Sequence, residues 1–278
     1  MTRLRDLPLL AILPLGKLVL HEFHDAQRSL PISRAIEQSG ILRNPPIVVP
    51  FQDGSGRYMV LDGANRTTAL QHLNVPHIVA QVVAPDDDGL QLTPWNHVIW
   101  GMPSDALLEA FAALPHVELV SASRMDDLPQ GRRRLGVFLH PDGAVYHLLT
   151  PHQRLIPFVQ VLNNVVDVYK LRASLDRTQV TDVETLRALY PALSGVLMLP
   201  HFRIDEVLQV VAEGHLMPPG STRFVVSPRA LHLNYPLERL RSPESLREKN
   251  ADLQEWVKER LARKAVRYYA EATYLFDE

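Results

Sequence analysis

The sequence predicts an α/β fold in the α+β sense, with a compact strand-and-helix unit first and a mixed α/β region after it. Three observations support this class. Short runs of β-branched and aliphatic residues alternate with segments of helical periodicity, and turn residues separate them. Of the 278 residues, 46% are hydrophobic and 22% are charged, an ordinary globular composition that allows one large domain or two modest ones.

The N-terminal unit is expected to begin with extended segments and one helix. Residues 11–20 suggest a short strand, a turn and a second extended piece. Residues 25–39 carry apolar side chains at near-helical spacing, and Gly40 suits the C-terminal stop of a helix. The run PPIVVPF, residues 45–51, favours a strand, because its leading prolines keep the preceding chain extended.

The same unit continues to an acidic turn at residues 84–89. Between residue 51 and this acidic turn we expect a turn at Asp53–Gly56, a strand at 57–61, a helix at Thr67–Leu73 and a buried strand at 77–83. This order implies a compact α/β unit, so we place a soft boundary there and expect domains at residues 1–84 and 85–278.

The second region mixes helices and strands. Its expected helices are 104–114, 154–171 with an interruption at Pro157, 203–214 and Glu244–Lys264. Its expected strands are a hairpin at 132–149 turning at Pro141–Gly143, then 222–227, 229–235 and Tyr268–Phe276.

Composition disfavours several classes of function. The formal net charge of −2 gives no global electrostatic footprint for nucleic acid, although it does not exclude a local basic patch. The absence of cysteine removes disulfides, thiolate metal sites and cysteine nucleophiles, and fits a reducing compartment. Proline, glycine and lysine break the apolar N-terminus, which predicts neither a signal peptide nor a membrane span. We expect a soluble, cytoplasmic protein.

The stretch YMVLDGANRTTALQHL, residues 58–73, has the residue types of a phosphate site. A helix that begins directly after a polar turn presents unpaired N–H groups and a positive dipole end. Arg66 adds a charged fork, Asn65 and Thr67 add neutral donors, and Gly63 permits close approach of the backbone. Asp62 would repel phosphate unless Mg²⁺ lies between them or the acid acts in catalysis. On residue types alone, a turn with a helix cap is the slightly better interpretation.

The wider run from Ser29 to Val75 resembles the ParB/sulfiredoxin nucleotide-binding domain in its helix, Pro-Ile strand, G-x-Y strand and D-G-x-x-R box. The resemblance covers about the first third of the chain. Sulfiredoxins need a cysteine, which is absent here. ParB-type clamps continue into a basic helix-turn-helix region, which this sequence does not show.

A third branch, the free L-serine kinases, is similar over nearly the whole chain. The similarity rests on LHE at 20–22, GRYMVLDGANR at 56–66, PWNH at 94–97, PPGSTRF at 218–224, LHLNYPL at 231–237 and the closing RYYAEATYLF. The order and spacing of six pieces are more specific than any single piece. The resemblance implies an enzyme that uses ATP or ADP with Mg²⁺ to convert L-serine into O-phospho-L-serine, in a branch that includes a kinase of siderophore synthesis.

The family pattern implies roles for individual residues. Glu22 becomes the catalytic base, and Asp62 assists through Mg²⁺ or as a second acid/base group. The expected nucleotide-binding residues are Gly63, Ala64, Asn65, Arg66 and Thr67. Without the resemblance, Glu22 reads as a solvent-exposed acid after a strand.

The amino-acid substrate is expected to meet a second group of residues. In GSTRF, Thr222 and Arg223 are expected to bind the serine carboxylate, with Arg223 supplying a bidentate fork. Trp95 and His97 are expected to line the substrate pocket. Each also has a structural interpretation: Trp95 as a core residue, His97 as a helix cap and Arg223 as a surface strand residue.

One residue departs from the family pattern. The branch usually has D-G-x-H-R, whereas this chain has Asn65, which neither carries charge nor titrates near neutrality. This change puts the rate and the nucleotide preference in doubt. Two alternatives stay open: a nucleotide-binding regulator that uses the same turn to control DNA or partner binding, and a kinase-like scaffold that has lost activity, with Asn65 as the lesion. The segment HEFH, from His21 to His24, lacks zincin spacing, so both histidines are read as structural or surface residues.

Overall fold

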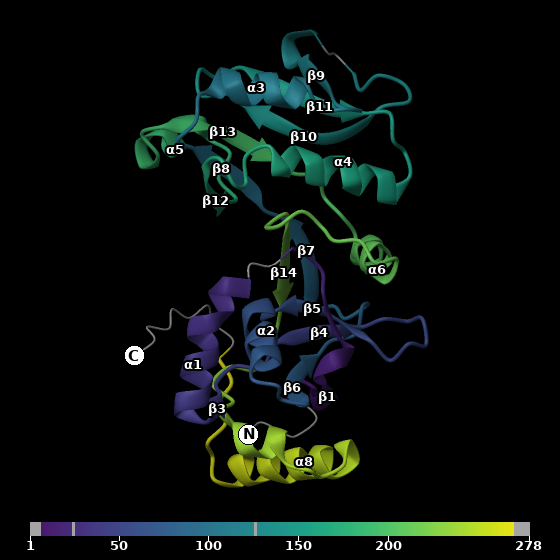
Figure 1. Ribbon diagram of the computed structural model, residues 1–278, viewed down its shortest axis with the longest axis vertical. Coiled ribbons are helices and arrows are strands. Elements are labelled where there is room, and N and C mark those ends of the chain that lie inside the picture. Colours follow the sequence, from purple (N-terminus) through teal and green to yellow (C-terminus); the bar gives the residue numbers. More distant parts are fainter. Residues whose placement is uncertain (1–6, 24–25, 125–126, 270–278) are drawn as a thin grey trace. The chain divides into compact units, whose positions relative to one another are not determined.

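The computed structural model describes residues 7–23, 26–124 and 127–269 (Figure 1). Its contacts divide the chain into two compact units that exchange segments along the sequence. The first unit comprises Met1–Val19, Asp25–Gly89 and Val226–Glu278, and the second comprises Leu20–His24 and Leu90–Val225. Each unit has its own sheet and its own helices.

A mixed five-stranded sheet forms the centre of the first unit. Its strands are β1 (Leu10–Pro14), β2 (Leu18–Leu20), β4 (Ile47–Pro50), β5 (Tyr58–Asp62) and β6 (His77–Val82), in the order β1-β6-β4-β5-β2. β6 runs antiparallel to β1 and parallel to β4, and β4 runs antiparallel to β5. The central apolar residues of β4, β5 and β6 are buried, which explains their near-continuous hydrophobic runs.

Helices flank this sheet. They are α1 (Leu30–Ser39), α2 (Ala64–His72), α7 (Leu237–Arg241) and α8 (Leu246–Ala262), with short 3-10 turns at Leu15–Lys17 and Ala26–Ser29. A two-stranded pair joins β3 (Ile41–Leu42) to β15 (Tyr235–Pro236). α1 packs beside α2, and α8 packs against β1 (Figure 1).

The C-terminal segment belongs to the first unit because of specific bonds. The side chain of Asn250 on α8 accepts a hydrogen bond from the Ile12 N–H and donates one to the Ile12 carbonyl, both at 2.9 Å. The buried Lys249 ammonium lies 3.1 Å from Nδ1 of His77, the first residue of β6. A division of the chain into residues 1–84 and 85–278 therefore differs from the contact pattern, which returns residues 226–278 to the first unit.

The second unit is built on a six-stranded antiparallel sheet. Its strands are β8 (Asn96–Trp100), β9 (Glu118–Ser121), β10 (Arg133–Leu139), β11 (Val145–Thr150), β12 (Ser174–Thr178) and β13 (Leu193–Met198), in the order β12-β8-β13-β10-β11-β9. A separate pair joins β7 (Leu90–Pro94) to β14 (Thr222–Val226), and a 3-10 turn spans Ala122–Arg124.

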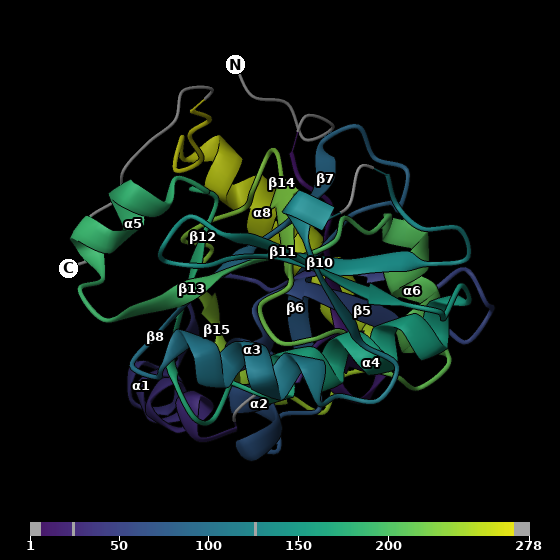
Figure 2. The same ribbon diagram turned by 90° about the horizontal axis from the view of Figure 1, so that it is seen from above.

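Helices cover both faces of this second sheet. They are α3 (Ser104–Ala112), α4 (Leu155–Asp167) and α5 (Val183–Leu189), and a fourth helix, α6 (Ile204–Ala212), packs against α4. α3 and α4 lie along one face and α5 on the other (Figure 2). On the first face, Phe111 of α3 makes edge-to-face contacts with Phe138 and Tyr169, and all three side chains are fully buried. On the opposite face, Leu186 of α5 packs with Val98 and Val196.

The predicted α/β class is confirmed, and so are most of the expected elements. The hairpin around Pro141–Gly143 forms β10 and β11, and Gly40 ends α1 with a φ of 66°. Pro157 does not interrupt its helix, because α4 begins at Leu155 and the proline occupies the first turn, where its missing N–H is not needed. None of the helices in the described ranges is long and apolar enough to cross a lipid bilayer.

Two expected strands differ from the structure. Of residues 229–235, only Tyr235 is in a strand, because the N–H groups of Ala230 and His232 bond to side chains and not to a neighbouring strand. The strand expected at Tyr268–Phe276 lies mostly outside the described residues, and Tyr268 and Tyr269 are not in a strand.

Candidate functional site

The polar turn between β5 and α2 forms the first group of candidate residues. Gly63 joins the two elements with a φ of 94°, in the left-handed region that favours glycine. A Cβ there would lie 2.8 Å from Cβ of Pro46 and 2.9 Å from Nη2 of Arg66. The turn therefore requires glycine both for its conformation and for the close approach of its neighbours.

Thr67 stabilises this turn through two hydrogen bonds to Gly63. Its N–H and its hydroxyl both donate to the Gly63 carbonyl, at 2.9 and 3.1 Å, and the residue is fully buried. The expected contact between the Thr67 side chain and a ligand is therefore replaced by a bond that shapes the turn. The N–H groups at the start of α2 precede the first intrahelical bonds, which leaves them available to an anion.

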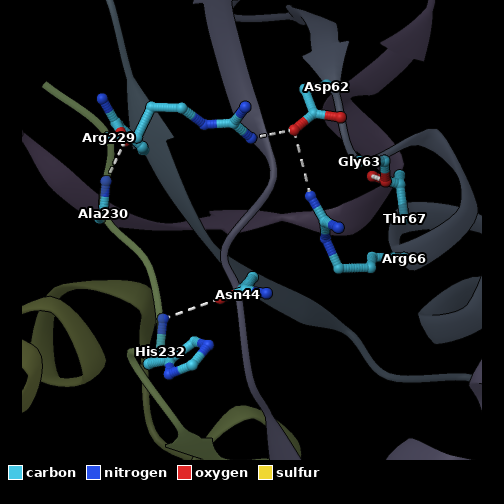
Figure 3. A network of polar contacts seen from close by, with 9 residues as sticks. Asn44, Asp62, Gly63, Arg66, Thr67, Arg229, Ala230 and His232 are labelled. Atoms are coloured by element: carbon cyan, nitrogen blue, oxygen red, sulfur yellow. Dashed lines mark hydrogen bonds and ion pairs between the residues drawn. The ribbon is translucent and has the colours of Figure 1, made fainter. Parts of the chain in front are cut away.

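Two arginines share one oxygen of Asp62 beside this turn. Arg66 Nη2 lies 3.5 Å from Asp62 Oδ2, and Arg229 Nη2 donates to the same oxygen from the other side (Figure 3). Burial lowers the pKa of the Arg66 guanidinium, and the Arg229 cation lowers it further while Asp62 opposes both. One carboxylate thus faces two guanidinium groups, and the cluster has an excess of positive charge.

Buried polar atoms without partners mark the same turn. Oδ1 of Asn65 and Nε of Arg66 are both buried and have no hydrogen-bond partner in the structure. Such atoms are uncommon in folded proteins and call for a physical explanation. The start of α2 therefore carries one acceptor and one donor that form no hydrogen bond with the rest of the described chain.

Glu22 begins the second group of residues, in the second unit. It follows β2 and forms an isolated parallel bridge with Met217, whose N–H donates to the His21 carbonyl at 2.8 Å. Its Oε2 accepts a hydrogen bond from the Gly220 N–H at 2.7 Å, and its side chain is only 19% exposed. The carboxylate is therefore held in a fixed place and is not the free surface acid of the alternative interpretation.

Arg177 joins Glu22 at Gly220. Its Nη2 lies 3.8 Å from Oε1 of Glu22, and its Nε lies 2.5 Å from the point where a Cβ on Gly220 would be. Gly220 has a φ of 73°. Glycine at this position therefore lets a cation and a carboxylate approach the same short stretch of backbone.

His97 bonds to the carbonyl of Gly220, whereas Glu22 bonds to its N–H. Its Nε2 lies 2.9 Å from the Gly220 carbonyl and its Nδ1 lies 2.7 Å from the Tyr169 hydroxyl. Because a carbonyl only accepts, Nε2 carries the proton and the Tyr169 hydroxyl donates to Nδ1. Burial lowers the pKa of His97 to about 4 and raises that of Tyr169. His97 has 0% exposure, so it supports the Gly220 loop from within and does not itself line a pocket.

The remaining expected substrate residues pair with each other or with neighbours. Thr222 is buried, and its hydroxyl lies 2.9 Å from Nε2 of His21. The Arg223 guanidinium lies over the Trp95 ring, 4.9 Å from its centroid. Trp95 and Arg223 are both partly exposed, so this stacked pair is accessible, whereas His21 and Thr222 form a buried support.

The structure thus sorts the predicted site residues into two groups. Asp62, Gly63, Ala64, Asn65, Arg66 and Thr67 meet at one turn of the first unit, and Glu22, Trp95, His97, Thr222 and Arg223 belong to the second. Three residues were missed from the sequence. Gly220 lies inside the quoted PPGSTRF piece, and Arg229 lies two residues before LHLNYPL. Arg177 lies in SLDRTQV, which carries no motif, so no local signal pointed to it.

The comparisons with known proteins agree along the length of the chain. The ATP-dependent L-serine kinase SbnI of Staphylococcus aureus (strain NCTC 8325 / PS 47) is 27% identical over 274 residues, 97% of each sequence. The structure of SbnI with C-terminal truncation from the same species matches with a TM-score of 0.69 at 25% identity, over 91% of this chain and 97% of that one.

A second solved structure shares the fold at lower identity. A free serine kinase in complex with AMP matches with a TM-score of 0.65 at 16% identity, over 83% of this chain and 93% of that one. No family model matches the sequence. The similarity to the free serine kinases that the six sequence pieces predict is therefore confirmed.

Proposed function

We propose that this chain, which resembles the free L-serine kinases along its length, is itself an ATP- or ADP-dependent L-serine kinase that forms O-phospho-L-serine. The observation that carries the proposal is the 27% identity to an ATP-dependent L-serine kinase over 97% of both sequences. The local geometry adds a fixed carboxylate at Glu22 and a cationic turn at Gly63. Phosphoryl transfer needs these two kinds of group, one to accept a proton and one to hold phosphate.

The turn at the start of α2 is assigned to the nucleotide phosphates. Backbone N–H groups at Gly63–Asn65 and the Arg66 guanidinium are suitable donors for phosphate oxygens. Asn65 takes the place of the histidine usual in this family, and its unpartnered oxygen shows that its amide is not occupied by a structural bond on that side. Thr67 sets the shape of the turn.

Glu22 is assigned as the general base. A serine hydroxyl is a weak nucleophile, and a carboxylate within hydrogen-bond reach accepts its proton as the new P–O bond forms. Oε2 is occupied by the Gly220 N–H, which leaves Oε1 for the hydroxyl. The proton goes to Glu22 and the nucleoside di- or monophosphate leaves.

The serine molecule is assigned to the residues around Gly220. Arg223, stacked on Trp95, offers a guanidinium fork to the substrate carboxylate. Arg177 is a second cation of the same kind beside Glu22. His97 and Thr222 act through the loop that they support.

A magnesium ion fits one carboxylate of the nucleotide group. Among the described residues there is no cluster of three or more His, Asp or Glu placed to hold a metal. Mg²⁺ in phosphoryl-transfer enzymes is commonly held by one or two carboxylates together with substrate phosphates, so Asp62 and the nucleotide phosphates would hold it. Bound there, the ion would neutralise charge on the transferred phosphoryl group.

The proposed location of the enzyme is the cytoplasm. A chain without cysteine is in keeping with that reducing compartment.

The experiment that tests the proposal is direct product detection. The purified chain is incubated with L-serine, Mg²⁺ and either ATP or ADP, and phosphorus NMR follows the appearance of O-phospho-L-serine. Formation with at least one donor supports the proposal, and the ratio of the two rates identifies the donor. Nucleotide binding without product, together with salt-dependent DNA affinity, would instead favour the regulator.

A further inference from the structure

Arg229 is placed by a short segment that is anchored to the sheet of the first unit. The side chain of Gln81 on β6 donates to the Pro228 carbonyl at 2.9 Å and accepts from the Ala230 N–H at 2.8 Å. Gln81 is only 3% exposed. Both polar ends of one buried amide therefore bracket Arg229, which fixes the direction in which its side chain leaves the backbone.

A second anchor lies two residues further along. The His232 N–H donates to Oδ1 of Asn44 at 2.7 Å, and the Asn234 N–H donates to the Arg43 carbonyl at 3.0 Å. Figure 3 shows the Arg229 guanidinium reaching from this segment toward the Asp62 oxygen that Arg66 also contacts. Side-chain and backbone hydrogen bonds thus anchor the segment that carries Arg229, and the Arg229 side chain points at the proposed phosphate turn.

The Arg229–Asp62 pair is poorly explained as a stabilising salt bridge. The two side chains are 41% and 43% exposed, and ion pairs at that exposure contribute little to stability. Asp62 also serves Arg66, so two cations divide one carboxylate. This arrangement leaves one positive charge uncompensated at the N-terminus of α2, where an anion is favoured by the helix as well.

We propose that Arg229 is a further nucleotide-binding residue, which Asp62 holds in position until the terminal phosphate of ATP or ADP takes its guanidinium. Gln81 is its positioning residue. The inference rests on the proposed function, because it takes the turn at Gly63 as the phosphate site. A guanidinium fork matches two phosphate oxygens, and Arg229, which shares one Asp62 oxygen with Arg66, offers the phosphate a second fork beside the first.

The test measures dissociation constants of adenosine, AMP, ADP and ATP by titration calorimetry on the full chain. Arg229→Met is compared with the wild type and with Arg241→Met, a control that removes an arginine of equal exposure paired with Glu37. We expect Arg229→Met to weaken ATP and ADP binding about tenfold or more, to weaken AMP less and to leave adenosine unchanged. Arg241→Met should bind all four like the wild type.

Two more variants separate a phosphate contact from a structural role. Arg229→Lys keeps the charge without the fork, so its ATP affinity should fall between those of the wild type and Arg229→Met. Gln81→Met removes both anchoring bonds and keeps the arginine, so it should weaken ATP binding in the same nucleotide order. If Arg229→Met fails to fold, Arg229→Lys decides the question.

The binding results separate the role of Arg229 from the proposed kinase function. Wild-type protein that binds no nucleotide would overturn both. Wild-type protein that binds ATP, with Arg229→Met or Arg229→Lys binding it equally well, would overturn only the role of Arg229. A uniform loss of affinity for adenosine and ATP alike would show a structural role and would also overturn it.

Discussion

The N–H of Gly220 donates a 2.7 Å hydrogen bond to the carboxylate of Glu22, 198 residues earlier in the chain. The carbonyl of the same glycine accepts from His97, and the edge of Arg177 lies where its Cβ would be. One residue without a side chain is therefore held by three others. The conformation of Gly220 therefore sets the position of Glu22, the proposed base.

Gly220→Ala should damage both stability and serine use. Alanine at a φ of 73° costs about 1–2 kcal/mol, and its Cβ would displace the Arg177 side chain beside Glu22. We expect kcat/KM for serine to fall about tenfold or more, with the dissociation constant of ATP unchanged. Steady-state kinetics and thermal unfolding measure the two effects.

A second glycine supplies the matched control. Gly214 has a φ of 81°, and a Cβ there would meet nothing within 4 Å. Gly214→Ala should therefore lose similar stability and keep the serine kinetics of the wild type. Equal kinetic losses in the two variants would show that strain alone, and not the packing at Arg177, explains the effect.

Buried His97 should make the protein less stable in acid. Its pKa is about 4 in the folded chain and 6.5 in the unfolded one, so between these values the unfolded chain binds the extra proton. Above pH 6.5 His97 should therefore make its full contribution to the free energy of unfolding. About 3 kcal/mol of that contribution should be lost as the pH falls to 4. Chemical unfolding at several pH values measures the slope.

His97→Gln isolates this contribution. The variant keeps a donor for the Gly220 carbonyl but loses the acceptor for Tyr169, so it should be less stable at pH 7 by about 1–3 kcal/mol. Its stability should also depend less on pH between 6.5 and 4 than that of the wild type. Parallel curves for the two proteins would be inconsistent with a neutral, buried His97.

Trp95 and Arg223 should act on serine binding as a pair. Arg223→Met and Trp95→Leu each remove the stacked arrangement, so each should raise KM for serine. The double variant should lose less than the sum, with a coupling of about 0.5–1 kcal/mol. Arg260→Met breaks a similar stack on Trp256 and serves as the control, with no change in KM. Strict additivity would argue against a shared role.

Asn65 should matter for the nucleotide and little for the fold. Because its buried carbonyl oxygen has no partner, Asn65→Ala should change the free energy of unfolding by less than about 1 kcal/mol. The same change should raise KM for ATP severalfold. Asn65→His restores the usual family pattern, so its ATP affinity should rise as pH is lowered from 7.5 to 6 and the imidazole gains charge. An unchanged KM in Asn65→Ala would remove Asn65 from the phosphate site.

Much of the fold was predictable because its signals are local. Aliphatic runs marked β4, β5 and β6, and a turn at Pro141–Gly143 marked the β10–β11 hairpin. The segment at 229–235 carries strand-like residues, yet side chains of Gln81 and Asn44 occupy its backbone donors. Such long-range bonds leave no trace in local periodicity, which is also why the return of residues 226–278 to the first unit was not foreseen.

The candidate site was predictable only where its residues fall within motifs. The polar turn at Gly63 and the acid at Glu22 both belong to quoted pieces of sequence. The buried role of His97 was not visible, because the piece PWNH suggests a pocket residue or a capping histidine and carries no sign that the side chain is fully buried. Arg177 reaches Glu22 through the pairing of β12 with β8, a relation that depends on the tertiary fold.

The central claim is that Glu22 accepts the serine proton in phosphoryl transfer from a nucleotide. Its most direct test is a single-turnover measurement of label passing from terminally labelled ATP or ADP to L-serine, in wild type and Glu22→Gln. The glutamine keeps an acceptor for the Gly220 N–H but is not a base, so we predict labelled O-phospho-L-serine from the wild type and a transfer rate about 10² to 10⁴ times lower in the variant, with nucleotide affinity retained. Equal rates in the two proteins, or no labelled serine from folded wild type with either donor, would contradict the claim.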